Sequence, residues 1–418
     1  MSSLLIEGGR RLSGAVSVEG NKNAALPLLA ACLLTSDECV LTNMPRIRDV
    51  EVMAQLLVDL GAQVEGIGTT TVRVRCPEVV KDEPDGAMVG RLRGSVLLLG
   101  PLLARRGRAR LAPPGGDFPA RRTISTHLEA LVSMGAVVLD QPGHVLECPD
   151  GLKPTSIYLY EASVTGTETA LLAAAAAPGI SEIRHAAQEP HVVELCVFLQ
   201  KLGVGITGAG SSTIRVEGGG KLGGASHTLW GDYIEAGSWA VVAAITGGEI
   251  DVHGARGEDI EVIAAVLKRL NIQCGMVNDV FRVEQSKPKA AGRITTGLWP
   301  GFPSDLVSLV TVLATQAEGR TLVHDWLYEL RLFALEQLSG MSADLFLCDP
   351  HRIIVTGPRK LRGRPLDSRD LRSGMALIAA ALAADGESRV TPLETVERGY
   401  AQLVDRLKGL GASVTRLG

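Results

Sequence analysis

Charged side chains stand at the beginning of several apolar segments, where buried helices would start. The residues concerned include Lys22, Arg93, Asp305, Asp370 and Arg372. The N–H groups and the dipole at a helix start favour anions, and nearby guanidinium or ammonium groups add to the attraction. The pattern therefore indicates local anion binding. For any single residue the simpler interpretation is a surface ion pair, or a helix cap in the case of Asn23 or Asp305.

The overall charge limits the partners that these groups could have. Lys and Arg total 42 against 46 Asp and Glu, a net charge of -4. A general surface for nucleic acid is therefore not indicated, and any phosphate recognition has to be local. We also expect no membrane anchor or signal peptide, because the N-terminus has no basic and apolar regions and the apolar runs are shorter than the roughly 20 residues of a membrane span.

The cysteines and histidines predict no metal site. Seven cysteines are scattered without a CxxC pair, which argues against disulfides and zinc and favours a reducing cytoplasm. His127, His185 and His324 lack the spacing of metal ligands, and a lone histidine is more often structural. The Gly-rich stretches form no dinucleotide fingerprint. We therefore expect no metal and no organic cofactor.

The elements that position the charged residues follow a repeat. The phrase Leu-Gly-Ala-Gln-Val that starts at Leu60 returns in related form six times in all, at Leu60, Met134, Leu202, Leu270, Met341 and Leu410. The starts are 68 to 74 residues apart, which is longer than ordinary solenoid repeats. Because 418 residues exceed what one hydrophobic core supports, we expect two domains of about 200 residues with three repeats each.

Each repeat is predicted to contain two helices and several strands. The first helix is apolar on all sides, which predicts complete burial; its copies span 24–34, 96–104, 170–177, 238–245, 306–314 and 375–383. The second helix, as in 50–60 and 396–410, is amphipathic. Alternating segments such as 39–42, 182–184, 249–252 and 321–324 are typical of strands. A tandem array of helices is the alternative, but it would not place strands in every period.

These patterns predict an α/β fold of six units, each ordered strand, helix, strand, helix, strand, strand. The helices would lie inside and the sheets outside. A Gly-rich stretch at 221–230 would form the hinge between the third and fourth units. Oligomeric state cannot be predicted from these features.

Six short segments give the sequence a resemblance to the enolpyruvyl transferase family, and within it to the nucleotide-sugar branch of peptidoglycan synthesis. They are Gly20 to Pro27, Gly115 to Asp117 with Arg122, Phe302 to Asp305, Glu329 to Arg331, Asp370 to Arg372, and Glu397 to Tyr400. The resemblance implies a two-domain inside-out α/β barrel, with residues 22–229 as one lobe and residues 1–21 and 230–418 as the other, closing on substrate. The Lys-Asn-Ala-Ala and Gly-Gly-Asp segments favour this branch over a shikimate-pathway transferase.

The implied donor is phosphoenolpyruvate, whose two anionic groups need a cationic cradle. By resemblance Lys22, Arg122 and Arg398 hold its phosphate, and Arg331 and Arg372 its carboxylate. Bidentate guanidinium groups suit both anions. Arg93 is implied as a supporting residue, and Asp370 belongs to the same set.

The implied reaction adds the donor to the 3-hydroxyl of UDP-N-acetylglucosamine and then eliminates phosphate. The catalytic residues by resemblance are Lys22, Asp305 as the base and Asp117 as the acid. Many family members have a cysteine at the position of Asp117. Nearby cations would lower the pKa of this carboxyl and burial would raise it, and the sequence does not decide between them. We expect the epoxide fosfomycin not to inactivate the protein, because fosfomycin acts on the missing thiolate.

The acceptor side departs from the family pattern. By resemblance the acceptor is bound by Asn23, Arg122, His127, Ser163, Val164, Ser304, Asp305, Leu327 and Tyr328. The loop from Thr123 to Thr126 differs from the family sequence, Glu161 replaces a lysine beside the diphosphate, and Thr165 and Leu330 replace a glycine and an asparagine. A different nucleotide or sugar acceptor, as in secondary metabolism, is therefore an alternative. A silent nucleotide-sugar-binding regulatory paralogue is a third possibility, against which the retained Lys22 and Asp305 argue.

Overall fold

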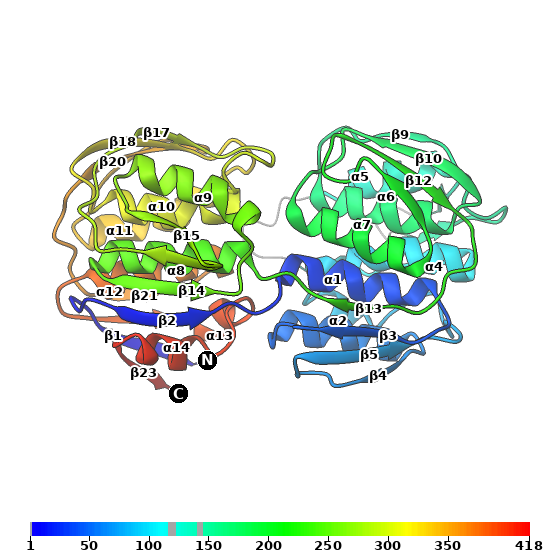
Figure 1. Cartoon of the computed structure of the whole chain (residues 1–418), viewed down its shortest axis with the longest axis horizontal. Helices are drawn as coiled ribbons and strands as arrows, with labels where there is room; N and C mark the ends of the chain where they lie inside the picture. Colours follow the sequence, from blue (N-terminus) through cyan, green and yellow to red (C-terminus); the bar gives the residue numbers. More distant parts are fainter. Residues whose placement is uncertain (1, 116–122, 140–144) are drawn as a thin grey trace. The chain divides into compact units, whose positions relative to one another are not determined.

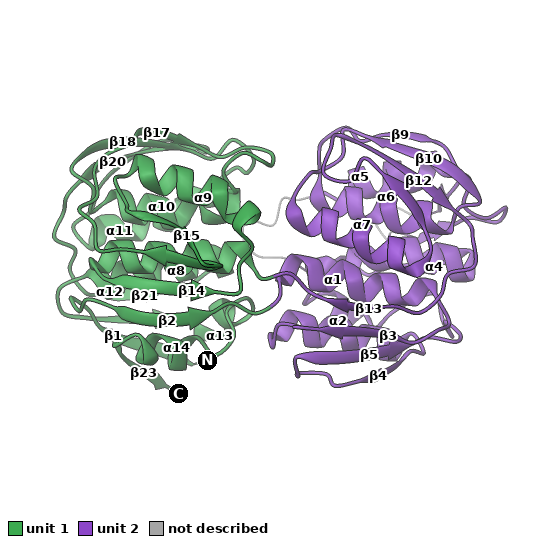
Figure 2. Cartoon of the chain, in the orientation of Figure 1, with its two compact units in different colours: residues 1–19, 117–119, 231–418 green, residues 20–116, 120–230 purple. Residues whose placement is uncertain are grey.

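The computed structural model describes residues 2–115, 123–139 and 145–418. The chain divides into two compact units, which are coloured in Figure 2. Unit 1 contains residues 2–19 and 231–418, and unit 2 contains the described residues between 20 and 230. The chain thus passes from one unit to the other after Glu19 and after Trp230. The second passage lies at the end of the Gly-rich stretch 221–230.

Three helices that are almost completely buried form the centre of unit 1 (Figure 1). They are α8 (Tyr233–Thr246), α10 (Val307–Ala314) and α12 (Leu371–Ala383). The other helical segments are α9 (Gly257–Arg269), η3 (Ser304–Leu306), η4 (Arg331–Glu336), α11 (Gln337–Gly340), α13 (Leu393–Glu397) and α14 (Leu403–Gly409). All eight residues of α10 are buried, as expected of a helix without a polar face.

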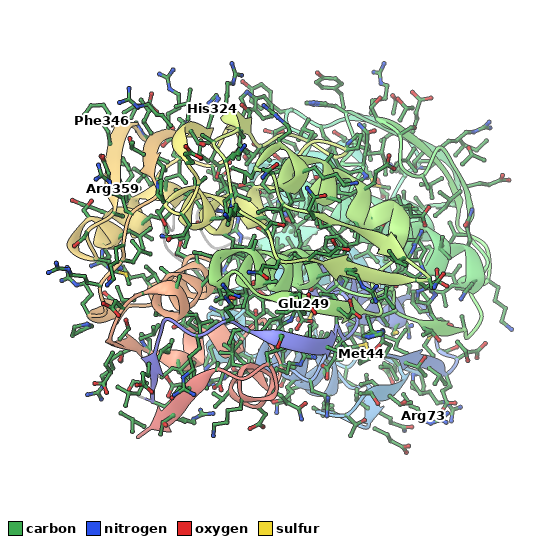
Figure 3. All side chains as sticks on the ribbon, turned by 60° about the vertical axis from the view of Figure 1, so that its left-hand side comes forward. Met44, Arg73, Glu249, His324, Phe346 and Arg359 are labelled. Atoms are coloured by element: carbon green, nitrogen blue, oxygen red, sulfur yellow. The ribbon has the colours of Figure 1, made fainter. Side chains whose placement is uncertain are left out.

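Three four-stranded sheets surround these helices. Their strand orders are β21-β22-β1-β23, β15-β16-β14-β2 and β17-β18-β20-β19. The strands are β1 (Ser3–Glu7), β2 (Ser13–Ser17), β14 (Glu249–His253), β15 (Cys274–Val277), β16 (Val280–Val283), β17 (Gly292–Thr295), β18 (Gly319–His324), β19 (Asp344–Asp349), β20 (Arg352–Gly357), β21 (Pro365–Asp367), β22 (Glu387–Thr391) and β23 (Ser413–Leu417). Figure 3 labels Phe346 on β19, whose side chain is 66% exposed, and Arg359.

Unit 2 repeats the same plan. Its buried helices are α1 (Lys22–Ala31), continued by η1 (Cys32–Leu34), α4 (Leu99–Arg106), preceded by η2 (Arg93–Leu98), and α6 (Val164–Ala176). The other helices are α2 (Arg48–Asp59), α3 (Gly86–Val89), α5 (Ser125–Ser133) and α7 (Pro190–Leu202). The predicted α/β class, with apolar helices inside and sheets outside, is therefore confirmed in both units (Figure 1).

The sheets of unit 2 have the orders β11-β12-β10-β9, β13-β3-β5-β4 and β6-β8-β7. The strands are β3 (Cys39–Thr42), β4 (Gln63–Glu65), β5 (Thr71–Arg75), β6 (Arg108–Arg110), β7 (Val137–Val138), β8 (Val145–Glu147), β9 (Ser156–Tyr158), β10 (Gly179–Arg184), β11 (Gly205–Thr207), β12 (Thr213–Gly218) and β13 (Ser226–Thr228). The second repeat lacks its expected first strand among the described residues. Pro77 and Pro84 flank the segment there, and proline cannot donate to a sheet ladder.

Two strands pair in the unit opposite to the helix that follows them. β2 precedes α1 of unit 2 but pairs in parallel with β14 of unit 1. β13 precedes α8 of unit 1 but pairs in parallel with β3 of unit 2. At the N-terminus, β1 pairs with both β22 and β23 and completes the sixth repeat. The exchange explains why the chain passes between the units twice.

One predicted helix is divided in two. The amphipathic pattern at 396–410 predicts a continuous helix, but the structure has α13 and α14 with a break between them. Within the break Tyr400 is fully buried and Gln402 has φ 51°, a left-handed conformation. An uninterrupted helix could not include this conformation, so burial of the Tyr400 ring overrides the helical pattern.

No helix in the described ranges is long and apolar enough to cross a membrane.

Candidate active site

Unit 1 gathers four predicted site residues at the beginnings of its buried helices. Ser304 and Asp305 lie in η3, directly before α10, and Arg372 lies in the first turn of α12. Asp370 caps α12, because its carboxylate accepts hydrogen bonds from the backbone N–H of Arg372 at 3.0 Å and of Ser373 at 2.9 Å. Asp370 therefore acts on the helix end that presents Arg372.

The Asp305 carboxylate joins two buried arginines. Its Oδ1 lies 3.1 Å from Nη1 of Arg331, and its Oδ2 lies 2.9 Å from Nη2 of Arg372. Nε of Arg372 donates to the same Oδ2 at 3.2 Å. Burial is the largest single effect and opposes the charge on Arg331 and Arg372, but Asp305 and the other acidic and phenolic groups around them together outweigh it and raise the pKa of both. The alternative interpretation of Asp305 as a simple helix cap is wrong, because no side chain caps η3.

A hydroxyl relay holds Arg331 from the other side. Nη1 of Arg331 donates to Oγ of Ser304 at 2.7 Å. Ser304 in turn donates to Asp325, whose carboxylate oxygens lie 2.9 and 2.8 Å away. Thr296 and the backbone N–H of Leu327 also donate to this carboxylate, at 2.8 and 3.2 Å. Asp325 is fully buried, so its charge strengthens these bonds.

One further predicted residue, Tyr328, lies beside this relay. The guanidinium carbon of Arg331 lies 4.5 Å from the ring centroid of Tyr328, a cation–π distance. Leu330, which follows in the same loop, has φ 62° and ψ 0°. Asparagine tolerates this left-handed conformation better than leucine does, which gives a physical reason for the asparagine expected at this position. Arg398 directly follows α13 and is partly exposed.

In unit 2, Lys22 forms a buried ion pair at the start of α1. Its Nζ lies 2.8 Å from Oδ2 of Asp49, and the two side chains are 12% and 5% exposed. The cap of α1 is Asn21 rather than the expected Asn23. The Asn21 side chain accepts from the backbone N–H of Asn23 at 2.8 Å and of Ala24 at 3.3 Å. Asn23 thus occupies the first turn of the helix.

Arg93 and His127 lie in the same part of unit 2. Nη2 of Arg93 donates to the backbone oxygen of Thr123 at 2.7 Å. Burial, with a smaller contribution from the Arg93 charge, lowers the pKa of His127 to about 4. The ring is therefore neutral at pH 7. Its Nε2 lies 2.8 Å from Oγ1 of Thr165.

The residues that depart from the family pattern contact one another. Thr126 donates to the Glu161 carboxylate at 3.3 Å, and Thr165 pairs with His127. These two bonds connect the first turn of α5 to the segment before α6 and to the first turn of α6. Ser163 caps α6 by accepting from the N–H of Gly166 at 3.2 Å, and Val164 is the first residue of the helix. The altered positions Thr126, Glu161 and Thr165 thus belong to one polar cluster of unit 2, whereas the altered Leu330 lies in unit 1.

Asp117 and Arg122 lie outside the described residues. Of the other predicted residues, the structure brings together Ser304, Asp305, Arg331 and Arg372 in unit 1. It places Arg93 with His127, and Lys22 with Asp49, in unit 2. In the described part of the chain, no group of three His, Cys, Asp or Glu residues could hold a metal ion.

Sequence reasoning missed Asp49, Asp325 and Ser238. Asp325 directly follows the predicted strand 321–324, and a carboxylate at a strand end is a recognisable signal. Asp49 begins an amphipathic helix, where an acidic residue is ordinary. Ser238 is a small residue inside an apolar helix and gives no signal, although its hydroxyl lies 2.8 Å from that of Tyr400.

Comparison with known proteins identifies the family. A family model described as EPSP synthase (3-phosphoshikimate 1-carboxyvinyltransferase) matches residues 6–407. The chain is 39% identical to the UDP-N-acetylglucosamine 1-carboxyvinyltransferase of Bradyrhizobium diazoefficiens, across 99% of this chain and 97% of the relative. It is 40% identical to the protein of the same name from Treponema denticola, across 99% of both.

A solved structure agrees with the sequence relatives. The crystal structure of the enolpyruvyl transferase NikO from Streptomyces tendae has a TM-score of 0.89 and 26% sequence identity, and the match covers 99% of this chain and 98% of that chain. The expected resemblance and the two-unit α/β fold are thus confirmed over nearly the whole length. The chain belongs to the EPSP synthase family of enolpyruvyl transferases.

Proposed function

We propose that the protein transfers the enolpyruvyl group of phosphoenolpyruvate to the 3-hydroxyl of UDP-N-acetylglucosamine and releases phosphate, as a cytoplasmic enzyme of peptidoglycan synthesis. The observation that carries the proposal is the pair of buried arginines, Arg331 and Arg372, bound to the two oxygens of one carboxylate. Two relatives with the printed name UDP-N-acetylglucosamine 1-carboxyvinyltransferase, matched over almost their full length, support the same reaction.

In this proposal the two anionic groups of the donor bind to different side chains. Arg331 and Arg372 hold the carboxylate, because their guanidinium groups both bind the carboxylate of Asp305 and so can bind another. Lys22, Arg122 and Arg398 hold the phosphate, with Arg93 in support.

The chemical steps need one acid and one base. Asp117 protonates the methylene carbon C3 of the donor, and the acceptor oxygen forms its bond to C2 while Asp305 removes the hydroxyl proton. Asp305, after it has released the hydroxyl proton to solvent, then removes a methyl proton from C3, the double bond re-forms, and the bond from C2 to the phosphate oxygen breaks. The cations around the phosphate stabilise the charge on the leaving group.

A different acceptor hydroxyl is the second candidate, and Glu161 favours it. The carboxylate of Glu161 stands where the family has a lysine beside the acceptor's diphosphate, and it would repel that group. Thr126 fixes the carboxylate at 3.3 Å from its own hydroxyl. UDP-N-acetylglucosamine nevertheless remains the first proposal because the named relatives carry that substrate in their names.

An acceptor screen tests both candidates. Purified protein would be incubated with phosphoenolpyruvate and either UDP-N-acetylglucosamine, uridine monophosphate or other nucleotide sugars, and phosphate release would be measured. Release with UDP-N-acetylglucosamine supports the first candidate, and release only with other acceptors supports the second. Binding of nucleotide sugar without phosphate release from any mixture would contradict both and would favour a regulatory paralogue.

A further inference from the structure

The Asp305 carboxylate is bound in the way that an external carboxylate would be. Each of its oxygens contacts a different guanidinium group, Oδ1 with Arg331 at 3.1 Å and Oδ2 with Arg372 at 2.9 Å. The arginine side chains are 11% and 9% exposed, whereas that of Asp305 is 27% exposed. Two buried cations sharing one carboxylate form a binding site of high affinity for that group.

The two arginines have further contacts that do not depend on Asp305. Arg331 donates to Ser304, which donates to the buried Asp325, and its guanidinium group lies over the Tyr328 ring. Nη1 of Arg372 donates to the hydroxyl of Tyr400 at 3.4 Å. The guanidinium groups would therefore keep their positions if the Asp305 side chain moved away.

We infer that Asp305 occupies the binding site of the donor's carboxylate and that the donor displaces it. The inference rests on the proposed function, because it takes Arg331 and Arg372 as the carboxylate ligands. Displacement moves the Asp305 carboxylate away from two cations. A carboxylate that loses two cationic neighbours binds a proton more strongly, so donor binding makes Asp305 a better base.

Displacement also has a consequence for affinity. The donor has to compete with a carboxylate that is part of the chain. The apparent affinity for the donor is therefore the intrinsic affinity multiplied by the fraction of molecules in which Asp305 does not occupy the site. Removal of the Asp305 charge should therefore strengthen donor binding while it lowers the rate of turnover. A base that only contacts the acceptor would show no such opposite effects on binding and turnover.

The test compares the dissociation constants of phosphoenolpyruvate for the wild type, Asp305→Asn and Asp367→Asn by isothermal titration calorimetry. Asp367 is a matched control, since its carboxylate binds Arg369 at 2.8 Å on the exposed surface of the same unit. We expect Asp305→Asn to bind phosphoenolpyruvate roughly tenfold more tightly and Asp367→Asn to bind as the wild type does. Asp305→Ala serves as a second variant with the same expected direction.

Inorganic phosphate separates displacement from a general change in charge. Phosphate lacks the carboxylate, so its dissociation constant should change by less than about twofold in Asp305→Asn. Equal or weaker binding of phosphoenolpyruvate to both Asp305 variants would overturn the inference, and so would an equal gain for phosphate. The failure of the proposed function would be seen separately, as the absence of wild-type phosphate release with every acceptor.

Discussion

The hydroxyl of Tyr400 accepts a hydrogen bond from Nη1 of Arg372 at 3.4 Å. Its other partner is Ser238, at 2.8 Å. Ser238 donates its single proton to the backbone oxygen of Ile234 at 2.7 Å, so Tyr400 has to donate to Ser238. The lone pairs of the Tyr400 oxygen are thereby directed to Arg372, which gives this buried tyrosine a defined role in positioning the guanidinium group.

Replacement of Tyr400 by phenylalanine should therefore weaken donor binding. Tyr400→Phe retains the buried ring but removes the hydrogen-bond acceptor, a loss of about 1 kcal/mol. We expect the KM for phosphoenolpyruvate to rise about fivefold and kcat to change by less than about twofold. Steady-state kinetics would measure both, with the KM for the acceptor as the internal control. A decrease in kcat at an unchanged donor KM would contradict the positioning role.

Glu168 makes a testable contribution to the pH dependence of stability. Its side chain is 1% exposed, and its Oε1 has no hydrogen-bond partner among the described residues. Burial, with a smaller contribution from Glu189, raises the pKa of Glu168 well above its ordinary value. As the pH rises, Glu168 therefore ionises in the unfolded chain at a lower pH than in the folded protein. Its contribution to the free energy of unfolding is most favourable below about pH 4.3 and decreases as the pH rises toward the folded-state pKa.

The isosteric variant Glu168→Gln removes this ionisation. We expect its free energy of unfolding at pH 8 to exceed that of the wild type by about 1 kcal/mol or more and the two proteins to differ less at pH 5. Urea unfolding at both pH values would measure the difference. Glu182→Gln is the matched control, because Glu182 is 47% exposed on β10 of the same unit. Equal pH dependence in Glu168→Gln and the wild type would rule out this contribution.

Glu161 should control the affinity for an acceptor that carries a diphosphate. Glu161→Lys exchanges a repulsive charge for an attractive one beside that group. We expect the KM for UDP-N-acetylglucosamine to fall about fivefold or more, with little change in the KM for phosphoenolpyruvate. Glu182→Lys provides the same change of charge at a site outside the cluster of Thr126, His127 and Thr165. An unchanged or higher acceptor KM in Glu161→Lys would place the diphosphate elsewhere.

The aspartate at position 117 should make the protein insensitive to fosfomycin. The epoxide reacts with a thiolate, and a carboxylate is a much weaker nucleophile toward it. Preincubation should leave the wild-type rate unchanged, whereas Asp117→Cys should lose activity with time. Mass spectrometry of the intact protein would detect a single adduct in the variant. An adduct on Asp117 of the wild type would disprove the prediction.

The sequence was sufficient to predict the elements that hydrophobicity determines locally. The buried helices were predictable because segments such as α10 have no polar face, and all eight residues of α10 are buried. The exchange of β2 and β13 between the units was not predictable from local pattern. The order of strands and helices along the chain is the same whether such a strand pairs in the unit of the helix that follows it or in the other unit. The break after α13 was missed because the apolar period continues through Tyr400.

The candidate site was predictable residue by residue but not as a network. The cationic residues and Asp305 could be predicted from the resemblance and from the positions of several of them at the starts of apolar helices. The relay from Arg331 through Ser304 to Asp325 joins residues 21 and 27 positions apart, and only the packing of β18 against α10 brings them together. The pairing of Thr126 with Glu161 likewise joins the first turn of α5 to the segment before α6, 35 residues along the chain.

Product formation from phosphoenolpyruvate and UDP-N-acetylglucosamine, followed by mass spectrometry together with phosphate release, would show whether the protein transfers the enolpyruvyl group to this acceptor. We expect one enolpyruvyl-nucleotide sugar for each phosphate released by the wild type. We also expect a rate in Asp305→Asn that is lower by a factor on the order of a hundred or more. The absence of this product from the wild-type reaction, or a near wild-type rate in Asp305→Asn, would contradict the proposed function.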